Sequence, residues 1–199
     1  MSMTNYEACG VIHQFRGDAL ITNTMSAMFA ISAVSPGPLN IASVPLMGGA
    51  SCLVAWASPS ALPGRQVMVL DGDASLLMEL GSLAQIADVA PPGFIHFVFN
   101  NGIQFSGVAN LDRPGRKVDF AVMALAAGYA SARRIDSVTA LAAAMPGLLQ
   151  QPGPHLVELV ISAPAKFTRE TTQPEFPDLQ FNRMAAEARA MMMALGTTR

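Results

Sequence analysis

The chain has 199 residues, of which 51% are hydrophobic and only 13% are charged, whereas charged residues average about 25% in globular domains. This composition excludes a disordered chain, which requires low hydrophobicity and high net charge. The 12 basic and 14 acidic residues give a net charge of −2. Without a basic surplus to neutralise phosphates, nucleic acid is not expected as a partner. We expect a single domain over residues 1–199, long enough to bury its own core.

The charges are unevenly placed, and residues 19–64 contain no Asp, Glu, Lys or Arg. A membrane helix needs about 20 consecutive, mostly apolar residues. The best window, residues 41–62, is interrupted by prolines, glycines and serines and lacks flanking basic clusters. We therefore predict no membrane span, and expect this stretch to be buried within the domain or against another chain.

The N-terminus and the cysteines indicate the compartment. Residues 1–7 lack the basic region and apolar run of a signal peptide. Cys9 and Cys52 are too few for a disulfide framework and are interpreted as plain buried thiols. A cytoplasmic location is expected.

Short apolar runs typical of strands alternate with segments in which apolar residues recur at helical spacing. The predicted strands are residues 19–22, 66–70, 94–99, 132–135 and 156–161. The predicted helices are residues 76–89, 119–128 (capped by Asp119), 137–149 (capped by Ser137) and 182–195. This alternation predicts an α/β protein with three α/β/α layers and a mainly parallel sheet. The Met-rich helix at 182–195 could pack within the chain or contact another subunit.

Polar residues follow the strands at 66–70 and 94–99, at the sheet edge where ligands bind in such folds. The first strand is followed by Asp71-Gly72-Asp73-Ala74-Ser75, and the second by Asn100-Asn101-Gly102. Each is also compatible with an ordinary turn. Together they place a carboxylate and an amide oxygen at neighbouring strand ends, and such hard oxygen ligands suit Mg²⁺ completed by phosphates. The sequence therefore favours a site for a magnesium-bridged diphosphate.

Gly72-Asp73-Ala74 and Asn100-Asn101, separated by residues 75–99, resemble the motif of thiamine diphosphate enzymes. Residues 69–86 (VLDGDASLLMELGSLAQI) are similar to the beta subunit of sulfopyruvate decarboxylases and the C-terminal half of phosphonopyruvate decarboxylases. The likeness extends over about residues 19–165. It implies the thiamine diphosphate-binding fold and a domain that binds the diphosphate and Mg²⁺.

By this resemblance, the Mg²⁺ ligands are the side chains of Asp73 and Asn101 and the backbone carbonyl of Ile103. Contacts with the cofactor are implied for Met47, Gly72, Asp73, Ala74, Ser75 and Asn101. Met47 is the bulky residue that would hold the cofactor bent, although a core methionine is the alternative. The Pro45 carbonyl would accept the aminopyrimidine, and Thr24 and Ser26 could touch the diphosphate or lie in a solvated turn.

Three positions depart from the family pattern. Ala74 replaces the third glycine of the motif and adds one methyl group near the phosphate. Asn100 stands where the family usually has an aspartate. Gln104-Phe105 replaces a Tyr-Glu pair in a loop that lines the substrate side in relatives, so the substrate is left open.

The family divides its active site between two domains, and the chain resembles only the diphosphate half. The resemblance therefore implies a pyrimidine-binding (alpha-type) partner subunit, which supplies the activating glutamate, and a second copy of this chain. No catalytic residue is assigned in this chain. The implied activity is decarboxylation of a small 2-oxo acid by a hetero-oligomeric lyase of which this chain is the beta subunit. Alternatives are another thiamine diphosphate enzyme such as a carboligase, or a noncatalytic cofactor-binding subunit.

Overall fold

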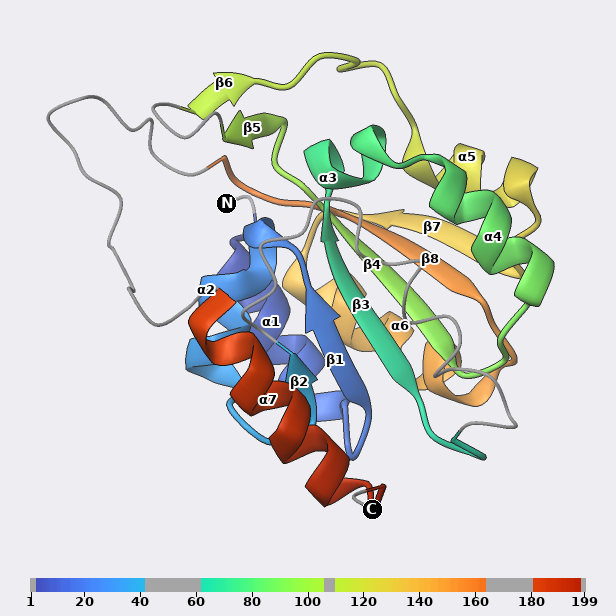
Figure 1. Ribbon diagram of the computed structural model, residues 1–199. Coiled ribbons are helices and arrows are strands. Elements are labelled where there is room, and N and C mark those ends of the chain that lie inside the picture. The colour runs from blue at the N-terminus through green and yellow to red at the C-terminus, as the bar shows by residue number, and fades with distance from the viewer. Residues whose placement is uncertain (1–2, 42–61, 106–109, 164–180, 198–199) are drawn as a thin grey trace, which may run out of the picture.

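The computed structural model describes residues 3–41, 62–105, 110–163 and 181–197. Six strands form one sheet in the order β2-β1-β3-β4-β8-β7, and every neighbouring pair is parallel (Figure 1). These strands are β1 (Leu20–Asn23), β2 (Asn40–Ile41), β3 (Val67–Gly72), β4 (Phe94–Asn100), β7 (Ser131–Ile135) and β8 (His155–Val160). A small antiparallel hairpin is formed by β5 (Ile103–Phe105) and β6 (Asn110–Asp112).

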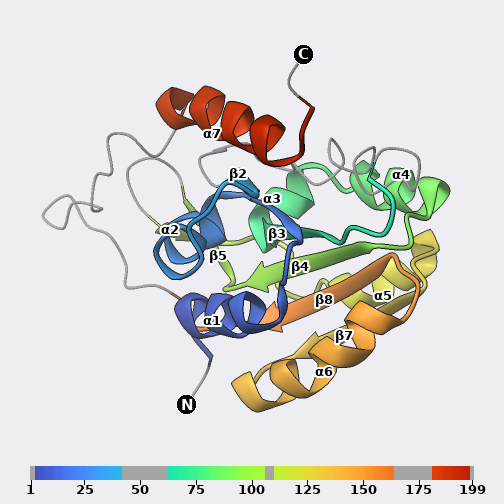
Figure 2. The same ribbon diagram turned by 90° about the horizontal axis from the view of Figure 1, so that it is seen from below.

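Helices cover both faces of the sheet and complete the three layers (Figures 1 and 2). The helices are α1 (Asn5–Phe15), α2 (Met25–Val34), α3 (Asp73–Met78), α4 (Gly81–Val89), α5 (Phe120–Ala127), α6 (Val138–Gln150) and α7 (Phe181–Ala194). One apolar cluster joins α1, α2 and α6 to one face, and a second joins α3, α4, α5 and α7 to the other. The predicted α/β/α fold with its parallel sheet is therefore confirmed.

The central strands are buried on both faces, which explains their continuous apolar sequences. Phe94, Phe97 and Phe99 of β4 are completely buried. The register pairs Val67 with Phe94 and continues along the strands to Gly72 opposite Phe99. Because β3 and β4 run in parallel and in step, the segments that follow them emerge side by side.

The strand order reverses direction at β1, since β2 lies on one side of β1 and β3 on the other. In open α/β sheets the ligand crevice lies at such a reversal, outside the carboxyl ends of the strands. Here that position is bounded by Thr24 after β1 and by Asp73 after β3. Topology thus points to the same strand ends as the sequence motif.

Most predicted elements are present within a few residues of the expected bounds. Asp119 caps α5 by accepting a hydrogen bond from the Val122 amide at 2.9 Å, and Ser137 caps α6 by accepting one from the Ala140 amide at 3.4 Å. His96 is completely buried in β4.

Several elements differ from the sequence prediction. Helices α1 and α2, strand β2 and the β5–β6 hairpin were not predicted. Helix α1 does carry a sequence signal, a capping box in which the Thr4 and Glu7 side chains each accept a hydrogen bond from the other's backbone amide. The predicted helix at 76–89 is wrong as a single element, because Glu79 leaves helical geometry (φ −141°, ψ 52°) and α4 begins afresh at Gly81.

The uncharged stretch is described over residues 19–41 and 62–64. Within β1 and α2 it is largely buried, as predicted, whereas the turn at Pro36, Gly37 and Pro38 is exposed. Helix α7 packs on the sheet through Met191, while Met193 is 68% exposed. Among the described helices, none combines the length and the hydropathy needed to cross a bilayer.

Candidate metal- and diphosphate-binding site

Asp73 is the first residue of α3 and lies directly after the end of β3. Its side chain is completely buried. The Ala74 amide donates to its Oδ1 atom at 2.9 Å. A fully buried carboxylate is costly unless charged or hydrogen-bonding partners surround it, so the partners of Asp73 define what this position can hold.

The loop after β4 meets Asp73 directly. The Gly102 amide donates to Asp73 Oδ2 at 2.9 Å, which joins the two polar segments predicted from the sequence. Gly102 has a φ of +69°, a left-handed conformation that favours glycine. The Asn101 Oδ1 atom accepts from the Ile103 amide at 2.8 Å, so this side chain is held by its own turn. The fold therefore brings together the loops that carry Asp73, Asn101 and Ile103.

The second partner of Asp73 is Arg113, which sequence reasoning did not identify. Its Nε atom lies 2.6 Å from Asp73 Oδ2, and the Arg113 side chain is only 2% exposed. The guanidinium also donates from Nη1 to the carbonyls of Pro114 and Gly115, both at 3.0 Å, and lies 5.4 Å from the centre of the Phe120 ring. Nothing in the local sequence marks this arginine, because the pair joins residues far apart in the chain.

Burial and these partners act on Asp73 in opposite directions. Burial raises the pKa of the carboxyl above its ordinary value, and this effect exceeds the lowering by the Arg113 charge and by the hydrogen bonds from Gly102, Arg113 and Ala74. The site therefore favours a positive charge close to Asp73, since a cation stabilises the ionised form.

A second buried carboxylate, Asp71, lies behind the site within β3. Its Oδ1 atom accepts from the Thr24 hydroxyl at 3.0 Å and from the Gly72 amide at 2.9 Å. Its Oδ2 atom lies 3.3 Å from His96 Nε2, and His96 Nδ1 lies 3.1 Å from the Tyr129 hydroxyl. Burial, followed by the Asp71 charge, raises the pKa of Tyr129. This network binds Thr24 into the core.

The predicted diphosphate contacts lie at the start of α3, and two of their amides have partners within the chain. The Gly72 amide also donates to Thr24 Oγ1 at 2.7 Å, and the Ala74 amide is bonded to Asp73. Ser75 is 8% exposed and Ala74 is half-buried. Gly72 itself has ordinary extended geometry (φ −90°, ψ 149°), so its conformation does not require glycine.

Glu158 is a further polar residue near the site that sequence reasoning missed. Asn100 Nδ2 donates to its Oε1 atom at 2.7 Å. The Glu158 side chain is completely buried, and its Oε2 atom has no hydrogen-bond partner among the described residues. Its signal in the sequence was available: a single charged residue within the apolar strand LVELVI. Glu158 thus holds the residue that precedes Asn101.

Three of the sequence predictions, Met47, Pro45 and Cys52, lie outside the described residues. The side chain of Ser26 also lies outside them.

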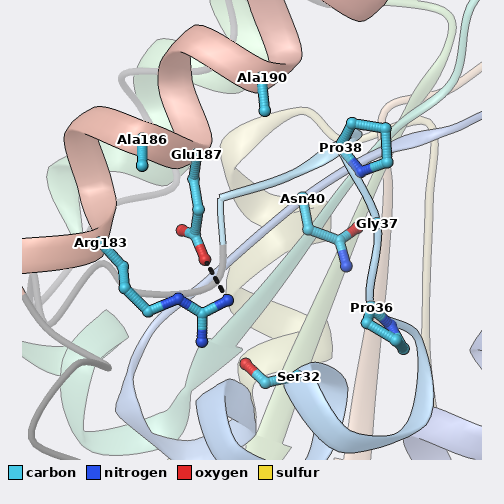
Figure 3. Close-up of a pocket in the computed structure, with 9 residues that line it drawn as sticks. All are labelled: Ser32, Pro36, Gly37, Pro38, Asn40, Arg183, Ala186, Glu187 and Ala190. Atoms are coloured by element: carbon cyan, nitrogen blue, oxygen red, sulfur yellow. Dashed lines mark ion pairs between the residues drawn. The ribbon is translucent and has the colours of Figure 1, made fainter.

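A groove of about 350 Å³ lies between α7 and the turn before β2, and Figure 3 shows that Ser32, Asn40, Arg183 and Glu187 line it. None of its lining residues is a predicted site residue.

The donor set at the two strand ends fits Mg²⁺ in its chemistry. In the described part of the chain, no three His, Cys, Asp or Glu side chains gather as a metal site. A metal here would therefore rest on one carboxylate, one amide oxygen and backbone carbonyls, which is the hard oxygen set that Mg²⁺ prefers alongside substrate phosphates. Arg113 already occupies the cation position beside Asp73. The residues present thus fit a cation at this position.

Comparisons with known proteins identify the family of the chain. Residues 42–159 match the family described as thiamine pyrophosphate enzyme, C-terminal TPP binding domain. Phosphonopyruvate decarboxylase of Streptomyces hygroscopicus is 36% identical over 127 residues, which cover 62% of this chain and 31% of that protein. Phosphonopyruvate decarboxylase of Streptomyces viridochromogenes is 39% identical over 99 residues, which cover 49% of this chain and 24% of that protein.

A solved structure has a related fold. The X-ray structure of a putative thiamin diphosphate-dependent enzyme isolated from Mycobacterium smegmatis superposes with a TM-score of 0.62 at 23% identity, covering 81% of this chain and 32% of that one. The chain thus spans about a third or less of the length of these relatives. Because the family match covers more than half of the chain, the chain belongs to the thiamine pyrophosphate enzyme family and is a C-terminal TPP-binding domain.

Proposed function

We propose that this chain is the diphosphate- and Mg²⁺-binding subunit of a thiamine diphosphate-dependent 2-oxo acid decarboxylase of the phosphonopyruvate or sulfopyruvate type. The observation that carries the proposal is the hydrogen bond from the Gly102 amide to Asp73 Oδ2, which joins the two predicted metal-binding loops. The identity to two phosphonopyruvate decarboxylases supports this reaction class.

In this proposal each residue has a separate task. Asp73 and Asn101 supply side-chain oxygens to Mg²⁺, and the backbone carbonyl of Ile103 supplies a third. Gly72, Ala74 and Ser75 hold the diphosphate at the start of α3, and Met47 supports the bent cofactor. The bound cofactor would supply an electron sink for the decarboxylation, which the residues of this chain do not provide themselves. We propose that a partner subunit with a pyrimidine-binding domain completes the site in the cytoplasm.

The chain itself supports the proposal, because residues behind the site hold the segments that carry the proposed metal ligands in position. Asp71, Thr24 and His96 fix the end of β3 from behind. Glu158 holds Asn100 and thereby the start of the Asn101 turn. Ligands positioned by such outer partners need little rearrangement to bind a metal, and changing such partners typically weakens metal affinity 10- to 100-fold.

A noncatalytic cofactor-binding subunit is the second candidate. Its support is Ala74 in place of the third motif glycine and Gln104-Phe105 in place of the Tyr-Glu pair. A change on the substrate side can remove turnover while Asp73 and Asn101 still bind Mg²⁺.

The test is calorimetric titration of the chain with thiamine diphosphate and Mg²⁺. We expect Asp73→Asn and Asn101→Ala to weaken binding at least ~100-fold, because each removes a direct metal ligand. Asp112→Asn is the matched control, since Asp112 is an exposed carboxylate on the neighbouring hairpin. Equal binding by Asp73→Asn and the unmodified chain would refute the assignment.

The activity is tested by mixing the chain with a pyrimidine-domain subunit and measuring CO₂ release from phosphonopyruvate, sulfopyruvate and other 2-oxo acids. Release that is lost in Asp73→Asn would support the decarboxylase. Cofactor binding without release from any of these acids would favour the noncatalytic subunit.

A further inference from the structure

Arg113 is held at Asp73 by contacts on several sides. Besides the 2.6 Å contact from Nε to Asp73 Oδ2, its Nη1 atom donates to two carbonyls of the turn that follows it. Its own backbone amide donates to the Gly102 carbonyl at 2.9 Å. A buried arginine with this many partners has a defined position, and it is not a surface side chain resting against an acid.

This position conflicts with a metal on the same oxygen. Asp73 Oδ2 already accepts hydrogen bonds from the Gly102 amide and from Arg113 Nε. These two bonds use both lone pairs of that oxygen. Mg²⁺ binds carboxylate oxygens at about 2.0–2.1 Å. A metal at Oδ2 would take the place of the Arg113 Nε hydrogen and would repel the guanidinium charge.

The segment that carries Arg113 can yield without loss of the core. Asp112, Pro114, Gly115 and Arg116 are all exposed, so Arg113 is the buried exception in its segment. Its neighbours contribute no buried side chain that would have to leave with it.

We propose that Arg113 is the resident counter-ion of Asp73 and that loading of Mg²⁺ with the diphosphate exchanges this guanidinium for the metal. The inference rests on the proposed function. It makes Arg113 a competitor of the metal: the residue keeps the empty site neutral and folded, and it lowers the affinity for a divalent cation.

The test measures Mn²⁺ binding by electron paramagnetic resonance in the presence of thiamine diphosphate, using the full chain. We expect Arg113→Gln to bind Mn²⁺ about 10-fold more tightly than the unmodified chain, because no cation has to be displaced. The metal-free variant should also melt at a lower temperature, because Asp73 has lost its counter-ion.

The matched control is Arg116→Gln. Arg116 carries the same charge three positions along the chain, but it is exposed and pairs with Asp112. We expect it to change Mn²⁺ affinity by no more than about two-fold, as a distant screened charge should. An Arg113→Gln affinity equal to or weaker than that of Arg116→Gln would overturn the exchange.

A second readout uses the unmodified chain and does not depend on the folding of any variant. The Arg113 Nε–H group, buried against Asp73, should give a protected ¹⁵N NMR signal that Mg²⁺ and thiamine diphosphate abolish. Persistence of that signal at saturating metal would overturn the exchange but leave cofactor binding intact. Absence of metal binding in the unmodified chain, in Arg113→Gln and in Asp73→Asn alike would overturn both this inference and the proposed function.

Discussion

Asp71 and Asp73 lie two positions apart, and both are completely buried, yet their surroundings differ. Two partners of Asp71 lie in strands of the sheet, the Gly72 amide in β3 and His96 in β4, and the third is Thr24, which directly follows β1. The partners of Asp73 are the adjacent Ala74 amide in α3 and two groups on connecting segments at the sheet edge, the Gly102 amide and Arg113. A carboxylate bound by strands stabilises the fold, whereas one bound by connecting segments can exchange its partners.

The comparison is tested most strongly by Asp71→Asn. The amide oxygen can still accept from the Thr24 hydroxyl and the Gly72 amide, but the NH2 group would take the place of Oδ2 and face His96 Nε2. The buried His96 ring would then lose its charged acceptor. We expect a loss of about 2–4 kcal/mol in the free energy of unfolding, measured by urea titration.

Its control is Asp18→Asn, which removes an exposed carboxylate paired with Arg65. Such surface pairs contribute about 1 kcal/mol or less. If Asp71→Asn were no more destabilising than Asp18→Asn, the Asp71 network would not be a stabilising element.

Asp73→Asn should have a smaller effect on stability than Asp71→Asn in the metal-free chain, but a larger effect on cofactor binding. We expect a smaller loss of unfolding free energy than for Asp71→Asn, because burial already opposes the charge on Asp73 and the residues on either side of Arg113 are exposed. Cofactor binding should be lost in this variant but only weakened, by about 10-fold, in folded Asp71→Asn, as calorimetry would measure. A cost as large as that of Asp71→Asn would show that Asp73 is as firmly built into the fold.

Tyr129→Phe tests how far the Asp71 network extends. The substitution removes the hydroxyl that lies 3.1 Å from His96 Nδ1 and leaves the buried ring in place. We expect a loss of about 0.5–1.5 kcal/mol, typical of one hydrogen bond, in urea unfolding. Tyr6→Phe, at a side chain that is 50% exposed, should leave stability unchanged. If the two variants were equally stable, the stabilising network would not extend beyond His96 to Tyr129.

Glu7 is an exposed carboxylate, and its substitution should change stability less than substitution of the buried Asp71 or Asp73. Hydrogen bonds from the Thr4 backbone amide and then from its hydroxyl lower the pKa of Glu7 below its ordinary value of 4.5. Because the folded-state pKa is lowered, its contribution is present above 4.5 and is lost as the pH falls through the folded value. Glu7→Gln should therefore lower the melting temperature slightly at neutral pH and leave it unchanged in strong acid. A difference that persists in strong acid would assign the effect to the amide rather than to the charge.

The sequence predicted the parts of the fold that depend on local chemistry. Apolar runs such as FIHFVF predicted buried parallel strands, and the caps Asp119 and Ser137 predicted helix starts. Helix α2 escaped prediction because it has no charged face, its cap residue Thr24 makes no side-chain capping bond, and its residues fit a strand as readily as a helix. The hairpin β5–β6 escaped because three-residue strands carry too little pattern.

For this protein, the sequence by itself determined where a site could lie, because the motif residues follow apolar strands and parallel strands end at one edge. Only the tertiary structure decided which partners each carboxylate has. Arg113 reaches Asp73, and His96 reaches Asp71, across the sheet or from a distant connection. Such contacts depend on strand order and on the path of the chain after β6, and no local pattern records either of them.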